Sequence, residues 1–213
     1  SDMTLLTSTS PAPSTARATV LEDRVSLRAP LVFALVILLG FGLLYSLVGT
    51  ALGSLLFPQQ ATGSIVMVDG MARGSSLVPQ PFSDARYFQA RPSAAGYDPM
   101  AAAGSNLARS NPDLRKRIDE LTGQVAQRDG ITAAQVPGEL VTQSGSGLDP
   151  HLSPIGAQVQ VARGAKARGL SEAEVTAVVA AHTESPQFGW LGEPRVNVLE
   201  LNLALDRLQS ARP

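Results

Sequence analysis

The longest apolar stretch of the chain lies near its N-terminus. No charged side chain occurs from Ala29 to Val68, and Leu31 to Phe57 is an almost continuous apolar run of about 27 residues. As an α-helix this run would be about 40 Å long, more than the roughly 30 Å hydrocarbon core of a bilayer. We therefore predict a transmembrane helix within residues 29–58. The alternatives are a buried core helix, which would carry a polar stripe, and a signal peptide, whose apolar region is shorter.

The flanks of the apolar run predict its orientation. Residues 1–28 are expected to form a disordered tail, because its Ser-, Thr-, Pro- and Ala-rich start offers too little apolar surface to fold. Arg24 and Arg28 precede the run, whereas the first basic residue after it is Arg73. Cytoplasmic flanks are enriched in basic residues. We therefore expect a cytoplasmic tail and an extracytoplasmic domain over residues 59–213.

One face of the predicted helix carries only small side chains. They are spaced i, i+4, i+7 and i+11 and include one G-x-x-x-G pair: Gly42, Ser46, Gly49 and Gly53. Small residues let a second helix approach closely in lipid. We interpret this stripe as a docking face for another membrane helix. The alternative is that glycine is simply frequent in membrane helices.

The pattern after Gln59 predicts a mixed domain that starts with a hairpin. Ser64 to Val68 is β-rich and is followed by the turn dipeptide Asp69-Gly70, and Ser75 to Val78 is the expected partner strand. Apolar spacing and capping residues then predict four helices. They run from Asn111-Pro112 to Gly130, from Ser153-Pro154 to Arg168-Gly169, from Ser171 with His182 on the apolar side, and over Leu201, Leu205 and Leu208. The expected fold class is α+β, with one N-terminal transmembrane helix and a single domain of several helices and a small sheet.

Composition and charge remove several classes of function. Charged residues make up 16% of the chain, below the roughly 25% of soluble proteins, while hydrophobic residues make up 44%. The 17 basic and 18 acidic side chains leave no field that would attract nucleic acid. Cysteine is absent, which excludes disulfides, thiolate metal sites and cysteine nucleophiles. Membrane lipid is therefore an expected partner and nucleic acid is not.

The richest polar segment runs from Val141 to Pro154, just before a predicted helix. It contains the candidate nucleotide or partner contacts Gln143, Ser144, Gly145, Ser146, Gly147, Asp149 and His151. Free N–H groups at a helix start can hold a phosphate, but the P-loop spacing and its lysine are missing. The simpler interpretation is a glycine turn whose Asp149 and Ser153 cap the helix entrance.

Enzymatic and metal chemistry find little support in these residues. Gly145-Ser146-Gly147 is not a G-x-S-x-G elbow, and the two histidines lie about thirty residues apart without a carboxylate cluster. We therefore expect no catalytic residue, no metal and no intrinsic cofactor.

A second polar cluster combines aromatic, arginine and amide side chains in a pattern typical of a protein interface. Its members are Arg86, Tyr87, Phe88, Arg91, Asn106 and Asn111. An ordered loop packed on its own domain remains the alternative.

The same segments resemble a known family. They are Arg73-Gly74-Ser75, Tyr87-Phe88 with Arg91-Pro92-Ser93, Gly104-Ser105-Asn106-Leu107 with Ser110-Asn111-Pro112, the loop from Val141 to Pro154, and Val196 to Leu199 with Leu201 to Asp206. In this order they resemble the C subunit of Kdp-type potassium-transporting P-type ATPases, the KdpC family, over about Pro30 to Leu208. The tail before Leu27 is longer than the family usually has, and Ala103 stands where a second glycine is expected.

The resemblance implies an accessory subunit of an ATP-driven, high-affinity potassium uptake complex in the inner membrane of a bacterium. The implied partners are a channel-like potassium-translocating subunit, a P-type ATPase subunit and a small single-span subunit. The D-K-T-G phosphorylation motif is absent here, and one helix cannot enclose a pore. The implied role is a catalytic chaperone that raises the ATP affinity of the ATPase subunit, with Gln143 to Gly147 likened to an ATP-binding loop.

The predicted orientation conflicts with direct ATP contact. It places the loop from Gln143 to Gly147 outside the cell, where cytoplasmic ATP does not reach it. We therefore favour assembly of the complex, with capping of the ion entrance, over nucleotide binding. The competing functions are a membrane-anchored hydrolase and an extracytoplasmic ligand-binding module.

Overall fold

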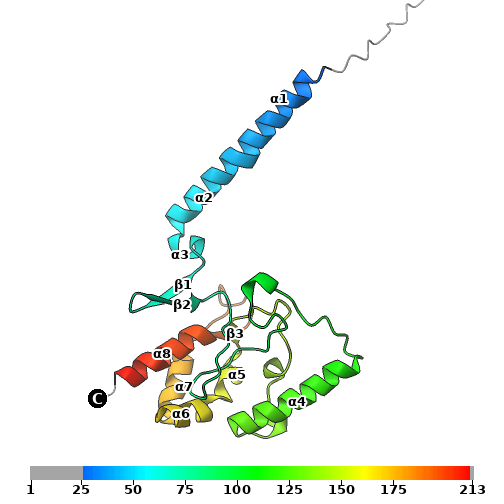
Figure 1. Cartoon of the computed structure of the whole chain (residues 1–213). Helices are drawn as coiled ribbons and strands as arrows, with labels where there is room; N and C mark the ends of the chain where they lie inside the picture. Colours follow the sequence, from blue (N-terminus) through cyan, green and yellow to red (C-terminus); the bar gives the residue numbers. More distant parts are fainter. Residues whose placement is uncertain (1–25, 212–213) are drawn as a thin grey trace, which may run out of the picture. The chain divides into compact units, whose positions relative to one another are not determined.

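The computed structural model describes residues 26–211 and divides into two compact units at Ala51 and Leu52. The predicted tail, residues 1–28, lies almost entirely outside the described residues. The described residues contain helices and two small sheets joined by irregular segments (Figure 1), which confirms the mixed fold class with one N-terminal apolar helix.

The predicted apolar helix is present and begins the described part of the chain. It comprises α1 (Arg28–Ile37), a π-helical segment (Leu38–Leu44) and α2 (Tyr45–Leu56). Over its 29 residues the mean hydropathy of the most apolar window is 2.7, and none of that window is buried. A bilayer would cover these side chains, and the helix satisfies its own backbone groups. Its length and composition are sufficient to cross a membrane.

The π-helical segment was not predicted. It contains two glycines, Gly40 and Gly42. Just beyond it, the Ser46 hydroxyl donates a hydrogen bond of 2.6 Å to the Gly42 carbonyl. Such segments widen a helix locally and rotate the residues that follow. Gly42 therefore belongs to the wider segment, whereas Ser46, Gly49 and Gly53 lie on the regular helix α2.

A short helix and a hairpin open the second unit. Helix α3 (Pro58–Ala61) leads to strand β1 (Ile65–Val68), which pairs antiparallel with β2 (Met71–Ser75). The turn at Asp69 and Gly70 has φ of 52° and 73°, the left-handed values of a two-residue hairpin turn. The predicted first strand and turn are confirmed. The predicted partner was wrong, because so tight a turn pairs the residues that follow it directly.

A second sheet has three very short antiparallel strands. Its order is β3 (His151–Leu152), β5 (Arg195–Asn197) and β4 (Thr183–Glu184), so β5 is central. Leu152 and Thr183 both pair with Val196, which is fully buried. This sheet ties the middle of the domain to its C-terminal part.

The helix before this sheet follows its sequence signals. Helix α4 (Pro112–Asp129) begins at Asn111, whose side chain accepts the N–H of Asp113 at 2.9 Å, and ends at Gly130 with a φ of 68°. The predicted helix is confirmed. Short 3-10 turns follow at Ala133–Gln135 and Gly138–Leu140.

The helix predicted from Pro154 to Arg168 is instead two helices. They are α5 (Pro154–Gln158) and α6 (Val161–Arg168). The Gln160 side chain donates to the Gly156 carbonyl at 3.2 Å, and the Gln160 backbone N–H turns to the Ala157 carbonyl at 3.0 Å. A side chain has therefore taken the acceptor that an uninterrupted helix would give to the backbone.

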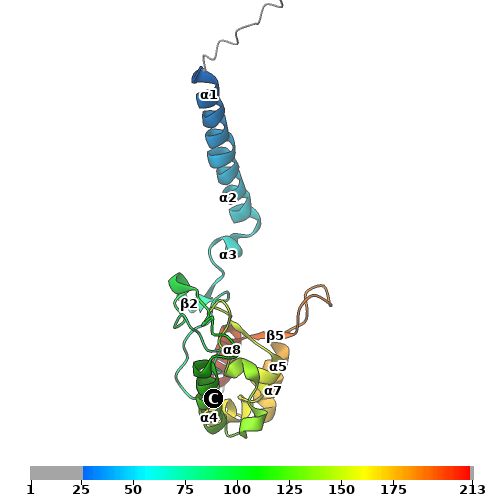
Figure 2. The same ribbon diagram turned by 90° about the vertical axis from the view of Figure 1, so that its right-hand side faces the viewer.

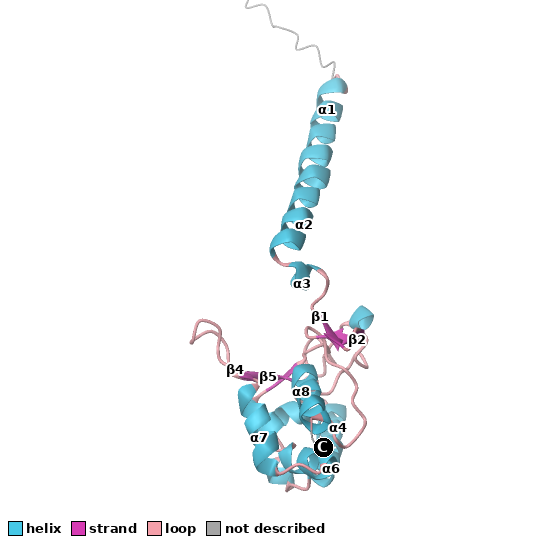
Figure 3. Cartoon of the chain, turned by 90° about the vertical axis from the view of Figure 1, so that its left-hand side faces the viewer, coloured by secondary structure: helices cyan, strands magenta, loops and turns pink. Residues whose placement is uncertain are grey.

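The last two helices complete the core. Helix α7 (Glu172–Ala181) opens with the predicted capping box at Ser171, and His182 caps its C-terminus. Helix α8 (Val198–Ser210) begins at Asn197. Figures 1 and 3 show α8 packed with α7 and α6 in the body of the domain. The fully buried side chains at its centre include Phe88, Leu152, Val161, Val175, Val196, Leu201 and Leu205.

Candidate functional site

The predicted interface and the predicted loop lie on irregular parts of the second unit. We call residues 85–93 the support segment and residues 141–150 the polar loop. Between β2 and α4 the chain has no helix or strand other than a 3-10 turn at Pro99–Ala101. Buried backbone groups in such a stretch need partners from side chains. Those partners come from α8, from α6 and from Gln160, which precedes α6.

Two amides hold the centre of the support segment. The Asn202 side chain accepts the N–H of Phe88 at 2.8 Å and donates to its carbonyl at 2.9 Å. The Gln160 side chain does the same for Gln89, at 2.9 and 3.1 Å. Each side-chain amide supplies one donor and one acceptor to the backbone, as a neighbouring strand would. The segment is therefore held in place without belonging to a sheet.

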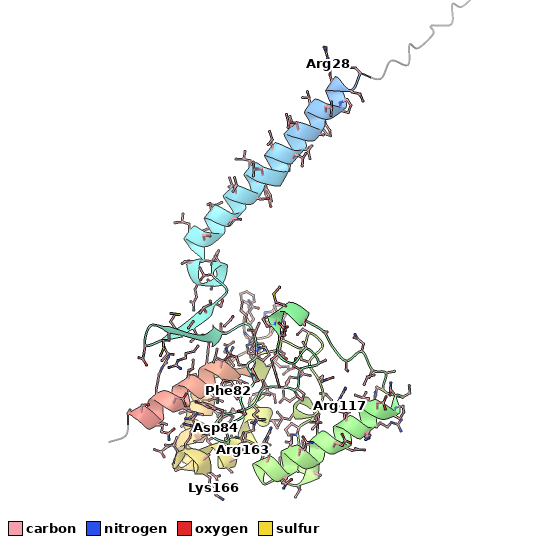
Figure 4. The ribbon with its side chains drawn as sticks, viewed as in Figure 1. Arg28, Phe82, Asp84, Arg117, Arg163 and Lys166 are labelled. Atoms are coloured by element: carbon pink, nitrogen blue, oxygen red, sulfur yellow. The ribbon has the colours of Figure 1, made fainter. Side chains whose placement is uncertain are left out.

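A charged cluster fixes the same segment from α4 and α6. The side chain of Asp129 is completely buried and contacts Arg163 and Arg128 at 2.6 Å each. Arg163 also donates to the carbonyls of Ala85 and Tyr87. Burial lowers the pKa of Arg163, and Asp129 opposes that shift. Figure 4 shows Arg163 beside the stretch that carries Phe82 and Asp84. Because losing either charge would leave the other buried and unpaired, this cluster is a structural support.

Two arginines lie close to the ring of Tyr87. The guanidinium of Arg168 lies 5.2 Å from the centre of its ring and that of Arg86 5.6 Å. Arg168 is fully buried at its side chain and bonds Asp206 of α8 at 2.7 Å. The Tyr87 hydroxyl is 3.4 Å from the same carboxylate. Stacking of this kind fixes an aromatic ring with little freedom.

The polar loop packs backbone against backbone on the chain that precedes α4. Gly147 has a φ of +72°, and a Cβ placed there would lie 2.6 Å from the carbonyl oxygen of Ala103. The Ser93 hydroxyl donates to the Gly147 carbonyl at 2.7 Å, and the Ser144 N–H donates to the Pro92 carbonyl at 3.1 Å. The loop is therefore held by its own domain. Of its two glycines only Gly147 needs the left-handed conformation; Gly145 has no positive φ.

Asp149 joins the polar loop to the support segment. Its carboxylate accepts the N–H of His151 at 3.1 Å and contacts Arg91 at 3.2 Å, with the His151 ring nitrogen at 3.5 Å. Hydrogen bonding from the His151 side chain, then from its N–H and from Arg91, lowers the pKa of Asp149 against an opposing effect of partial burial. The expected cap at Ser153 is present, since its hydroxyl accepts the Gly156 N–H at 3.0 Å.

The candidate nucleotide contacts do not converge on one exposed pocket. Ser144 and Gly147 are buried, whereas Gly145 and Ser146 are exposed. The hydroxyls of Ser144 and Ser146 face each other at 3.2 Å. The Gln143 side-chain oxygen is buried and has no hydrogen-bond partner within residues 26–211. The loop's hydroxyls and its carboxylate are mostly engaged inside the domain.

The predicted interface residues divide between the core and the surface. Phe88 is fully buried and presents no surface to a partner. Asn111 is used as the helix cap of α4. Arg86 is exposed but bonds Asp84 at 2.9 Å, which raises its pKa through that side-chain hydrogen bond. Asn106 is exposed with a φ of 51°.

A hollow of about 980 Å³ lies between the hairpin, the stretch around Tyr87 and α8. Its lining carries both signs of charge: Arg73, Arg86 and Arg207 with Asp69 and Asp206. No residue of the polar loop lines it. The hollow and the sequence-predicted loop are thus separate features.

Sequence reasoning missed the residues that fix the support segment. Gln160 and Asn202 are polar residues at otherwise apolar helical positions, and both are buried to 1% exposure or less. A polar residue at a position expected to be buried indicates that its side chain hydrogen-bonds to another segment, and this could have been inferred from the sequence. Asp129 gave no such signal, because a carboxylate in the last turn of a helix is ordinary on a surface.

Known proteins share this sequence over nearly its full length. The model of the KdpC family, described as the c chain of the K+-transporting ATPase, matches residues 27–207. A potassium-transporting ATPase KdpC subunit from Xanthomonas campestris pv. campestris is 62% identical over 91% of this chain and 92% of that protein. Proteins of the same name from Sorangium cellulosum and Shewanella putrefaciens are 53% and 49% identical, over 84% and 82% of this chain and 96% and 88% of their own lengths.

These matches confirm the resemblance seen in the motifs. They cover the apolar helix, the support segment, the polar loop and α8 together. The chain belongs to the KdpC family, the c chain of potassium-transporting ATPase complexes.

Proposed function

We propose that this chain is a non-catalytic subunit that anchors and helps assemble an ATP-driven, high-affinity potassium uptake complex. The observation that supports this proposal is that the polar loop is bonded to other residues of its own domain. Its Gly147 carbonyl accepts a hydrogen bond from Ser93, and its Asp149 carboxylate contacts Arg91, as a rigid scaffold requires and a free nucleotide cradle does not. The expected partners are a channel-like potassium-translocating subunit, a P-type ATPase subunit and a small single-span subunit.

The helix α2 is the proposed site of assembly within the membrane. An added Cβ at Gly49 or Gly53 would meet no atom of this chain within 4 Å, so this face is open to another helix. In lipid, close packing of small residues replaces the hydrophobic drive that water provides. A bulky side chain there would separate the two backbones.

Copurification tests this assignment. Gly49→Leu together with Gly53→Leu should reduce, severalfold, the amount of partner subunits purified with the chain from membranes. The matched control is Ala51→Leu together with Ser54→Leu, which adds similar bulk on the opposite side of the same two turns. Equal copurification of both double variants would show that the stripe contacts only lipid. Failure of the unmodified chain to copurify with any multi-span subunit would overturn the proposed function.

The second part of the proposal is an indirect effect on ATP use. A subunit that stabilises the complex can raise the apparent ATP affinity of the ATPase subunit without touching nucleotide, which is the chaperone role that the family suggests. Arg24 and Arg28 favour a cytoplasmic tail and an extracytoplasmic domain, and the family suggests an inner-membrane location. In that orientation the polar loop does not meet cytoplasmic ATP.

Cysteine labelling tests the orientation, because the chain has no native cysteine. Ser146 is exposed at the surface of the polar loop, and Ser10 lies in the tail. In intact cells a membrane-impermeant thiol reagent should modify Ser146→Cys and spare Ser10→Cys until the inner membrane is opened. The reverse pattern would overturn the orientation and restore direct ATP contact.

A further inference from the structure

An arm projects from the sheet between β4 and β5. We call residues 185–194 the aromatic arm. Its base is held by strand pairing and by a 2.6 Å ion pair between Arg195 and Glu184. Near its tip, Gln187 and Leu191 exchange two backbone hydrogen bonds of 2.9 Å each. Figures 2 and 3 show the arm extending beyond β4 and β5, away from the helices. The arm is therefore built by its own backbone bonds.

The tip presents large apolar side chains to the outside of the domain. Phe188 is 78% exposed, Trp190 75% and Leu191 43%. Phe188 also has a φ of 56°, an unfavourable value for an aromatic residue. Packing within the domain does not account for these side chains, because they bury little surface there. Large apolar side chains that gather at one exposed place mark a site of contact with a protein or a membrane.

The chemistry of the arm matches a bilayer interface. No charged residue occurs between Glu184 and Glu193, and the tip combines tryptophan, phenylalanine and leucine. Tryptophan is enriched at the headgroup level, where its ring is buried and its N–H stays hydrated, and phenylalanine and leucine occupy the acyl boundary. Contact between this surface and lipid requires no complementary shape.

The covalent path from the apolar helix keeps this domain close to a membrane. Helix α2 ends at Leu56 and β1 begins at Ile65, so only residues 57–64 connect them. Even fully extended, such a connection spans at most about 30 Å. Within the domain, both views place the arm at the end where β1 and β2 lie. The arm is thus attached to the part of the domain that the connection reaches first.

We propose that the aromatic arm inserts Phe188, Trp190 and Leu191 into the lipid interface and gives the domain a second membrane contact. A protein partner is the less favoured occupant. A stable protein interface buries about 800 Å² on each side, which a narrow tip with three large side chains does not offer by itself. The proposal rests on the membrane anchoring of α1 and α2, and its test checks that anchoring separately.

Trp190 is the only tryptophan of the chain, so its fluorescence reports on the arm alone. The full chain is reconstituted into vesicles of phosphatidylethanolamine and phosphatidylglycerol with brominated acyl chains, which quench only inserted rings. Two further proteins carry Trp190→Phe with one new tryptophan, at Leu47 in the helix or at Lys166, which is exposed on α6 at the end of the domain opposite β1 and β2 (Figure 4). Strong quenching is expected at positions 190 and 47 and little at 166. Phe188→Ser with Leu191→Ser should remove most of the quenching at 190.

The outcomes separate the arm from the anchor. Quenching at position 47 without quenching at 190 overturns the arm proposal and leaves the anchor intact. Loss of quenching at both positions overturns the anchor itself. In membranes that contain the whole complex, a photo-crosslinking residue at position 188 should form adducts with lipid. An adduct with another subunit would assign the arm to a protein partner and overturn the proposal.

Discussion

The polar loop and the aromatic arm are two glycine-containing loops with opposite uses. Both are joined to the three-stranded sheet, the loop before β3 and the arm between β4 and β5. In the loop, Gly147 combines a positive φ with a backbone contact that excludes any Cβ. In the arm, Gly189 and Gly192 have φ of 82° and 85° but open space around them. Glycine permits close packing in the first case and only redirects the chain in the second.

The same contrast holds for side chains. The serine and aspartate groups of the polar loop bond within the domain: Ser144 contacts Ser146, and Asp149 contacts His151 of β3. The arm spends backbone bonds on its own shape and leaves Phe188 and Trp190 exposed. The polar, motif-rich segment is therefore structural, and the short segment whose tip carries no charge is the better candidate for contact with the surroundings.

The largest expected effect is at Gly147. Gly147→Val should lower the free energy of unfolding by about 3 kcal/mol or more, because it adds backbone strain to a clash with the Ala103 carbonyl. Chemical denaturation of the full chain in detergent measures this. Gly189→Val in the arm carries the strain without the clash and should cost about 1–2 kcal/mol. Gly145→Val has neither and is the near-neutral control. Equal costs at 147 and 189 would abolish the distinction between the two loops.

Local signals in the sequence were sufficient for much of the fold. The start of α4 at Asn111, its end at Gly130 and the capping box at Ser171 are all determined by residues within a few positions of one another. The break between α5 and α6 was not predictable in this way, since Gln160 interrupts the helix while bonding Gln89, 71 residues earlier. The hairpin partner was predicted a few residues too late, although the dipeptide Asp69-Gly70 favours a two-residue turn and so a strand that begins at Met71.

The site was predictable only in outline. The motifs identified the polar loop and the stretch around Tyr87, but sequence alone does not show which side chains face inward. Phe88 was expected at an interface and is in the core, because Asn202, 114 residues away, binds its backbone. The aromatic arm was not predictable from the sequence, because three large apolar residues in a stretch of ten are common and only their exposure in the structure distinguishes them.

An intermediate effect is expected at Asp149. The pKa of its carboxyl is lowered in the folded chain, so its contribution to stability is complete above the unfolded pKa near 4 and is lost as the pH falls through the folded value. Asp149→Asn should therefore cost about 1 kcal/mol at neutral pH, a modest figure because the carboxylate is one third exposed. The deficit should shrink below about pH 4.

Unfolding free energies measured from neutral to acid pH check this dependence. The matched control is Asp119→Asn, which alters an exposed carboxylate on α4 and should change stability by less than about 0.5 kcal/mol. A deficit at Asp149 that stays constant into acid would mean that the shape of the side chain, and not its charge, joins the loop to Arg91.

The smallest expected effect on stability is at Gln143, where the measurement of interest is ATP. Its side-chain oxygen has no hydrogen-bond partner in the described part of the chain, so Gln143→Ala breaks no bond at that atom and should change the unfolding free energy by less than about 0.5 kcal/mol. A buried carbonyl without a partner is also what a ligand-binding loop would show before its ligand arrives. The stability result alone therefore does not separate architecture from nucleotide binding.

Titration calorimetry of the full chain with ATP separates them, with Ser146→Ala as the matched variant in the same loop. If the polar loop is architecture, neither the unmodified chain nor the variants give saturable heats. The apparent Michaelis constant of the assembled complex for ATP then changes only when copurification of the subunits also falls. Saturable ATP binding that Gln143→Ala removes, with a matching rise in that constant and unchanged assembly, would make the loop a nucleotide site. The polar loop and the aromatic arm would then both be contact surfaces, the first for nucleotide and the second for lipid.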